Sequence, residues 1–179
     1  MDAGVVLQFW FEDLSPKEKF QKNPELDERI RQKFDAVHHA ACRGELFRWR
    51  VTPTGRLAEI IVLDQLTRNM FRDDPRAFAY DSLALVLAQE AVHQGADQDI
   101  PISQRSFLYM PYMHSESPVI HEEAVKLFST EGLSANLDYE LRHKAIVDRF
   151  GRYPHRNAIL GRESTPEELE FLKQPGSRF

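Results

Sequence analysis

The chain has 179 residues, enough for a hydrophobic core, and we expect residues 1–179 to fold as one domain. The formal net charge of −5 argues against attraction of the whole protein to nucleic acid or to an anionic membrane. The single cysteine, Cys42, excludes an internal disulfide and a cysteine-rich metal site. The sequence has no signal-peptide pattern at its start, and no apolar run approaches the ~20 residues that a membrane span needs. We therefore expect a cytoplasmic protein without a membrane partner.

Signals for helix starts recur along the chain, each a capping residue followed by proline. They fall at Ser15-Pro16, Asn23-Pro24, Thr52-Pro53, Asp74-Pro75, Ser117-Pro118 and Thr165-Pro166. Apolar residues recur at helical spacing, and the alternation that marks strands is absent. The helices are predicted over residues 2–14, 24–43, 53–71, 75–94, 118–131 and 137–150. This pattern predicts an all-α fold, a compact array of antiparallel helix pairs with no sheet.

The predicted helix over residues 53–71 carries a polar stripe beside its apolar face. Asp64, Arg68 and Arg72 are spaced at i, i+4 and i+8, and Gln65 and Asn69 flank them. The simpler interpretation is a solvated face, on which the Asp64–Arg68 pair contributes ~0.3 kcal/mol. The alternative is the polar wall of a groove in which Asp64 orients Arg68.

The segment 105–116 is rich in aromatic residues and methionines, and Pro111 is expected to interrupt any helix there. One interpretation is a core-lining connection, because Phe and Met fill gaps in cores. However, this segment also carries two hydroxyls, an imidazole and a carboxylate, each of which needs a partner when buried: Tyr109, Tyr112, His114 and Glu116. An aromatic wall with a few polar groups is also typical of small-ligand sites.

Four arginines gather in the segment 149–165, between glycines and a proline that interrupt the helical pattern. They are Arg149, Arg152, Arg156 and Arg162. Guanidinium groups match the geometry of carboxylates and phosphates, so the cluster predicts an anion site. The structural alternative is that these arginines cap helix ends or pair with nearby acids.

We predict no metal site and no cofactor from the sequence. His121-Glu122 begins like a zinc-protease motif, but Val125 stands where the second histidine belongs. His38 and Cys42 lie one helical turn apart, yet two ligands do not make a site. A catalytic zinc held by His114, Glu116 and His155 is a minor alternative. Phosphate-binding glycine motifs and the nucleophile-elbow motif are absent.

Three long motifs resemble one bacterial family. They are residues 56–72, RLAEIIVLDQLTRNMFR, residues 107–116, FLYMPYMHSE, and residues 149–157, RFGRYPHRN. The sequence resembles, over nearly its whole length, the family catalogued as domain of unknown function 924. The resemblance implies an all-α fold similar to tetratricopeptide-like helical proteins, and it implies no reaction and no catalytic residues.

Our first functional hypothesis is a binding protein whose three motifs converge on one pocket for a small anionic molecule or an acidic peptide. The predicted ligand-binding residues are Arg68, Asn69, Arg72, Arg105, Tyr112, Arg152, Arg156, Asn157 and Arg162.

The second hypothesis is a hydrolase or transferase that acts on a phosphorylated or carboxylated substrate. His114 or His155 would be the general base, oriented by Asp64 or Glu116, with arginines stabilising charge. A third hypothesis, RNA binding through the basic segment, is opposed by the acidic net charge.

Overall fold

The computed structural model describes residues 1–178. Within them every regular element is helical, and no strand occurs. The α-helices are α1 (Ala3–Gln8), α2 (Pro16–Phe20), α3 (Pro24–Cys42), α4 (Pro53–Ile61), α5 (Thr67–Met70), α6 (Asp81–His93), α7 (Ile102–Met113), α8 (Pro118–Phe128), α9 (Ser134–Phe150) and α10 (Pro166–Phe171). Short 3-10 turns occur at Phe47–Val51, Pro75–Phe78, Ala96–Asp99 and Pro154–Arg156. The predicted all-α class is confirmed.

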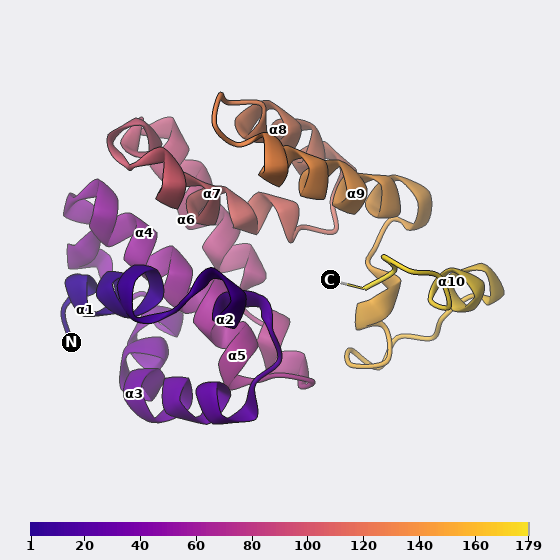
Figure 1. The fold of residues 1–179 in the computed structure, drawn as a ribbon, viewed down its shortest axis with the longest axis horizontal. Coiled ribbons are helices and arrows are strands. Elements are labelled where there is room, and N and C mark those ends of the chain that lie inside the picture. The colour runs from indigo at the N-terminus through magenta and orange to yellow at the C-terminus, as the bar shows by residue number, and fades with distance from the viewer. Residues whose placement is uncertain (179) are drawn as a thin grey trace.

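The helices up to α9 form a main body, and residues 151–178, the C-terminal segment, lie beside it. Helices α6, α7, α8 and α9 pack each on the next, while α4 contacts α1, α6 and α7. Figure 1 shows α9 leading out to the chain that carries α10, and the last residues turning back toward the centre. The C-terminal segment contacts the start of α6, where Arg156 approaches Asp81.

Several helix starts follow the predicted capping chemistry. The Ser15 and Thr165 side chains each accept a hydrogen bond in a complete capping box, and Asn23 and Thr52 cap α3 and α4. At the end of α9, Gly151 has a φ of 67°, which a residue with a Cβ rarely adopts. The chain therefore turns toward the C-terminal segment at the residue that the sequence indicated.

Pro111 does not interrupt the helix, so that expectation was wrong. It lies inside α7, which continues to Met113. All residues from Ser106 to Met113 are buried. The apolar packing of this segment outweighs the roughly 3 kcal/mol that an internal proline costs a helix.

Two π-helical turns alter the register of predicted helices, one over Phe9–Asp13 and one over Val62–Leu66. The second turn adds a residue between α4 and α5 and changes the register of the predicted helix there, although Asp64 and Arg68 remain paired at 3.2 Å. Asp64 lies in this turn and is 0 % exposed. The solvated-face interpretation of the stripe on residues 53–71 was therefore wrong.

The main hydrophobic core is built by α1, α3, α4, α6, α7 and α8, and it includes Trp10, Phe34, Tyr109 and Phe128. A smaller core joins α9 to the C-terminal segment through Ile146, Val147 and Tyr153. The C-terminal segment is thus attached by its own apolar contacts as well as by polar ones.

Candidate active site

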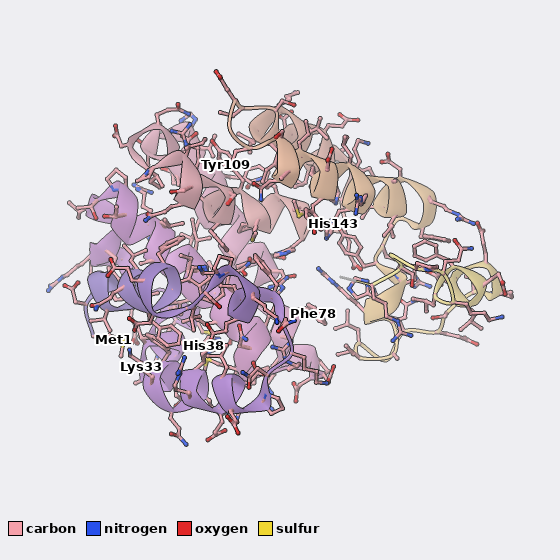
Figure 2. All side chains as sticks on the ribbon, viewed as in Figure 1. Met1, Lys33, His38, Phe78, Tyr109 and His143 are labelled. Carbon is pink, nitrogen blue, oxygen red and sulfur yellow. The ribbon has the colours of Figure 1, made fainter. Side chains whose placement is uncertain are left out.

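A cleft of about 290 Å³ lies where the start of α6 and the end of α7 meet the C-terminal segment. Its polar lining includes Asp81, His114, Glu116 and Arg156. Its other lining residues are Pro75, Phe78, Ala79, Ser82, Leu85, Pro111, Ser115 and Leu160. Figure 2 shows Phe78 at the border of the main body, facing the C-terminal segment.

Asp64 and His114 form a hydrogen-bonded pair behind this cleft. His114 Nδ1 lies 2.7 Å from Asp64 Oδ1, and the amide of Gln65 donates to the other carboxylate oxygen at 2.6 Å. Burial alone would raise the pKa of Asp64, but the charge of Arg68 and the hydrogen bonds from His114 and Gln65 hold it below its usual range. Asp64 is therefore ionised at neutral pH.

Burial and the charge of Arg68 lower the pKa of His114, and Asp64 offsets only part of this effect. The imidazole is accordingly neutral near pH 7. Its Nδ1–H donates to the ionised Asp64, which leaves Nε2 unprotonated. No hydrogen bond within residues 1–178 engages Nε2, and the His114 side chain lines the cleft.

Arg68 and Arg156 meet at Asp81, the first residue of α6. Arg68 donates to Asp81 Oδ2 at 2.9 Å, and Arg156 approaches the same oxygen at 3.3 Å. The guanidinium of Arg156 lies 4.6 Å from the ring centre of Phe78 and 4.7 Å from that of Tyr153, so it is held between two aromatic faces.

Two polar atoms at this junction, Asp81 Oδ1 and Arg156 Nε, are buried and have no hydrogen-bond partner among residues 1–178. Arg156 is only 6 % exposed, and its Nη2 donates to the carbonyl oxygen of His114 at 3.0 Å. A buried polar group without a partner costs about 1–3 kcal/mol.

The C-terminal arginines pair with carboxylates that come from elsewhere in the chain. Arg162 forms two hydrogen bonds to Glu116, at 2.6 and 2.8 Å, and Arg152 pairs in the same way with Glu168 at 2.7 and 2.8 Å. The sequence did not show that Glu116 and Glu168 lie beside these arginines. The excess of positive charge that motivated an anion site is thus largely neutralised within the fold.

Asn157 joins the same network. Its amide donates to Ser164 Oγ at 3.0 Å and to Glu168 at 3.3 Å, and its carbonyl oxygen accepts from Arg162. The roles of Arg152, Asn157 and Arg162 in the structure are to order the segment that forms one side of the cleft.

Four other candidate residues do not line the cleft. Asn69 and Arg72 both donate to Asp27 on α3, Arg72 through two nitrogens at 2.6 and 2.8 Å. Arg105 contacts Gln98 and the carbonyl oxygen of Ile100, and Tyr112 is buried in the main core. Helix α5 ends at Met70, so Arg72 lies beyond it and does not continue the face that carries Arg68.

His155 also falls outside the cleft lining. Its ring centre lies 5.6 Å from that of Tyr153, and burial lowers its pKa to about 4. Of the two histidines considered as the general base, His114 lines the cleft and His155 does not.

The sequence reading missed a second carboxylate–imidazole pair, His121 with Glu140. His121 Nδ1 lies 2.6 Å from Glu140 Oε1, and its Nε2 lies 2.8 Å from the carbonyl oxygen of Ser115 and 3.1 Å from Tyr153 Oη. Both side chains are 0 % exposed. No sequence signal joined them, because the two residues lie on different helices, α8 and α9.

No group of three metal-ligating side chains is assembled among residues 1–178. Both oxygens of Glu116 bond to Arg162, and His114 Nδ1 bonds to Asp64. His38 Nε2 lies 3.0 Å from Thr67 Oγ1. As a separate observation, no helix in the described part of the chain is long and apolar enough to cross a membrane.

The fold and the cleft define a class: an all-α protein with a buried aspartate–histidine pair at the border of a C-terminal segment. A family model described as bacterial protein of unknown function (DUF924) matches residues 6–176, and the chain belongs to this family. The solved structure of the protein of unknown function ATU0120 from Agrobacterium tumefaciens is similar, with a TM-score of 0.91 and 37 % identity over 96 % of each chain. A search of curated proteins gives no match.

Proposed function

We propose that the cleft is the active site of a hydrolase or transferase in which His114 is the general base. The observation that carries this proposal is the 2.7 Å contact between His114 Nδ1 and the buried, ionised Asp64. A carboxylate in this position fixes the tautomer and the orientation of the imidazole, and it stabilises the imidazolium that forms when Nε2 accepts a proton.

The chemistry that this geometry supports is activation of a hydroxyl or of water. Nε2 of His114 takes the proton, and the oxygen that loses it attacks an electrophilic carbon or phosphorus of the substrate. The bond from that atom to the leaving oxygen then breaks, and the leaving oxygen takes the proton from His114. Negative charge that develops on the substrate would lie near Arg156, which lines the same cleft. Transfer to a substrate hydroxyl gives a transferase, and transfer to water gives a hydrolase.

The lining limits the substrate. A volume of about 290 Å³ suits a small molecule rather than a folded partner. Asp81 and Glu116 line the cleft together with Arg156, so a dianionic phosphate would meet repulsion. These charges favour a substrate with one carboxylate over a phosphorylated one.

Hydrolysis of p-nitrophenyl acetate and p-nitrophenyl phosphate tests the proposal. We expect ester hydrolysis by the native protein and a loss of about 10²–10⁴-fold in His114→Gln, the usual contribution of a general base. His93→Gln is the matched control, because His93 is exposed and outside the cleft. Equal rates in the native protein and His114→Gln would contradict the proposal.

A second candidate is binding of a small anionic molecule without chemistry. It is supported by Arg156, a buried cation whose Nε has no hydrogen-bond partner within the described residues. It would be distinguished by calorimetric titration with acetate and with inorganic phosphate, since Arg156→Gln would abolish binding whereas His114→Gln would retain it. An acidic peptide is less well supported, because the cleft is small and most arginines already have acidic partners.

Four other expectations from the sequence concern the helix arrangement, the cellular location, the number of domains and RNA binding. The serial packing of α6 to α9 supports a tetratricopeptide-like arrangement of helix pairs, which we retain as a proposal. The cytoplasmic location and the single domain stay predictions. RNA binding through the segment 149–165 has little support, because Arg149, Arg152, Arg156 and Arg162 pair with protein carboxylates.

A further inference from the structure

A second cavity, of about 520 Å³, lies between the C-terminal half of α3 and the chain that follows α5. It has no residue of the Asp64–His114 pair in its lining, and it meets the first cleft only at Ala79. Figure 2 shows His38, one of its lining residues, on the side of the main body away from His143 and α9. The second cavity is therefore a distinct feature of the molecule.

One wall of the second cavity is aromatic. The rings of His38 and Phe71 have centres 5.3 Å apart, and those of His38 and Tyr80 are 5.9 Å apart and nearly perpendicular. All three residues line the cavity. Aromatic faces and edges arranged in this way bind another planar ring well, by stacking or by edge-to-face contact.

The rim of the second cavity carries three guanidinium groups, from Arg31, Arg43 and Arg76. Asp35 is the one carboxylate among the lining residues. The guanidinium of Arg76 lies 4.5 Å from the ring centre of Phe71, so charge and aromatic surface adjoin each other.

These arginines differ from those of the first cleft in the strength of their existing pairs. Arg31 pairs with Glu28, Arg43 with Glu45 and Arg76 with Asp74, and these side chains are between 35 and 65 % exposed. Ion pairs this exposed contribute little to stability. A ligand carboxylate or sulfonate can therefore displace the protein carboxylates at little cost.

We propose that the second cavity binds a small molecule that has a planar aromatic ring and one anionic group. The ring would contact Phe71 and Tyr80, and the anionic group would pair with the guanidiniums at the rim. This proposal is independent of the chemistry proposed for His114.

Cys42 provides the readout, because it lines the second cavity and is the only cysteine of the chain. Burial raises the pKa of its thiol, so alkylation by iodoacetamide is best measured near pH 9, by intact mass. The probe is naphthalene-2-sulfonate. Its two controls are 2-naphthalenemethanol, which has the ring without the charge, and methanesulfonate, which has the charge without the ring.

We expect naphthalene-2-sulfonate to slow alkylation about tenfold at ten times its dissociation constant. Each control compound should give less than about twofold slowing at the same concentration. Arg76→Gln and Phe71→Leu should each weaken protection by about tenfold, the effect of one lost charged or aromatic contact. Arg48→Gln makes the same charge change at an exposed site outside the cavity and should leave protection unchanged.

Three results would overturn the proposal. The first is alkylation at an unchanged rate with millimolar naphthalene-2-sulfonate. The second is equal protection by methanesulfonate, which would indicate general screening of charge. The third is protection that persists in both Arg76→Gln and Phe71→Leu, which would place the probe elsewhere. Circular dichroism of each variant verifies that it is folded before labelling.

Discussion

The two buried carboxylate–imidazole pairs within residues 1–178 are alike in contact distance and differ in what surrounds them. The Asp64–His114 contact is 2.7 Å and the Glu140–His121 contact is 2.6 Å. His114 lines a cleft with its second nitrogen unengaged, whereas both nitrogens of His121 have partners and its side chain is 0 % exposed. The pairing alone therefore does not identify a reactive site.

The partner of the second nitrogen decides where the protons lie. Nε2 of His121 faces the carbonyl oxygen of Ser115, which only accepts, so Nε2 carries a hydrogen. Burial raises the pKa of Glu140, which favours a neutral pair with one proton shared between Glu140 and Nδ1. In the other pair Arg68 keeps Asp64 ionised, and the proton lies on Nδ1 of His114. The Asp64–His114 pair therefore presents an unprotonated nitrogen to a cavity, whereas the Glu140–His121 pair is fully buried.

The largest effect is expected from Asp64→Asn, which removes the buried charge that holds Arg68 and His114. Breaking a buried ion pair costs about 3–5 kcal/mol, and Arg68 would keep Asp81 as a carboxylate partner. The thermal unfolding midpoint should fall by roughly 10 °C. A fall of only 1–2 °C by differential scanning calorimetry would show that Asp64 is not ionised in the folded protein.

The second-largest effect is expected from acidic pH, which should lower the stability of the fold. Burial lowers the pKa of His143 to about 3 and that of His155 to about 4. The unfolded state binds these protons first, so stability is full above about pH 6.5 and is lost as the pH falls below it. A depression of even one pKa unit on each histidine gives about 3 kcal/mol in total.

The unfolding midpoint should therefore drop by about 6–12 °C between pH 7 and pH 4.5. The raised pKa of Glu140 acts with the opposite sign, since that contribution is lost as the pH rises. A midpoint that is constant over this interval would refute the claim that the buried histidines are neutral.

Glu140→Gln is expected to have a small effect, because the glutamine amide can donate to Nδ1 of His121 as the protonated acid does. We expect a change below about 1 kcal/mol in the free energy of unfolding. Ionisation of the native Glu140 carboxylate is unfavourable in the folded protein. The free energy of unfolding of the variant should therefore rise relative to that of the native protein between pH 6 and pH 9. Chemical denaturation at both pH values measures this difference. A cost equal to that of Asp64→Asn would remove the distinction between the two pairs.

The smallest effect is expected from Arg76→Gln at the rim of the second cavity. Its pair with Asp74 is exposed, so the unfolding midpoint should not change measurably. A clear loss of stability would mean that Arg76 has a structural role, through its contact with the ring of Phe71.

Local features of the fold were predictable, because they depend on neighbours in the sequence. Capping residues before proline marked the starts of α2, α3, α4 and α10, and Gly151 marked the end of α9. Pro111 was misjudged because the packing of α7, a tertiary effect, outweighs its local preference.

The site was only partly predictable, because its contacts join distant residues. The sequence reading nominated Asp64, His114 and Arg156, yet it could not show that Asp81 lies beside Arg156, which is 75 positions away. Nor could the sequence show that Asp97 is buried and accepts a hydrogen bond from Tyr109, which is 12 positions away. The spacing of apolar residues predicts which face of a helix is buried, but it does not predict which residues contact that face.

The most direct test of the central claim is the rate at which diethyl pyrocarbonate modifies each histidine at pH 7, mapped by peptide mass spectrometry. This reagent attacks an unprotonated imidazole nitrogen that it can reach. The account predicts that His114 is modified at least about tenfold faster than His121, with exposed His93 as the upper reference. Modification of His121 as fast as His114, or no modification of His114, would contradict the assignment of His114 as the base of the cleft.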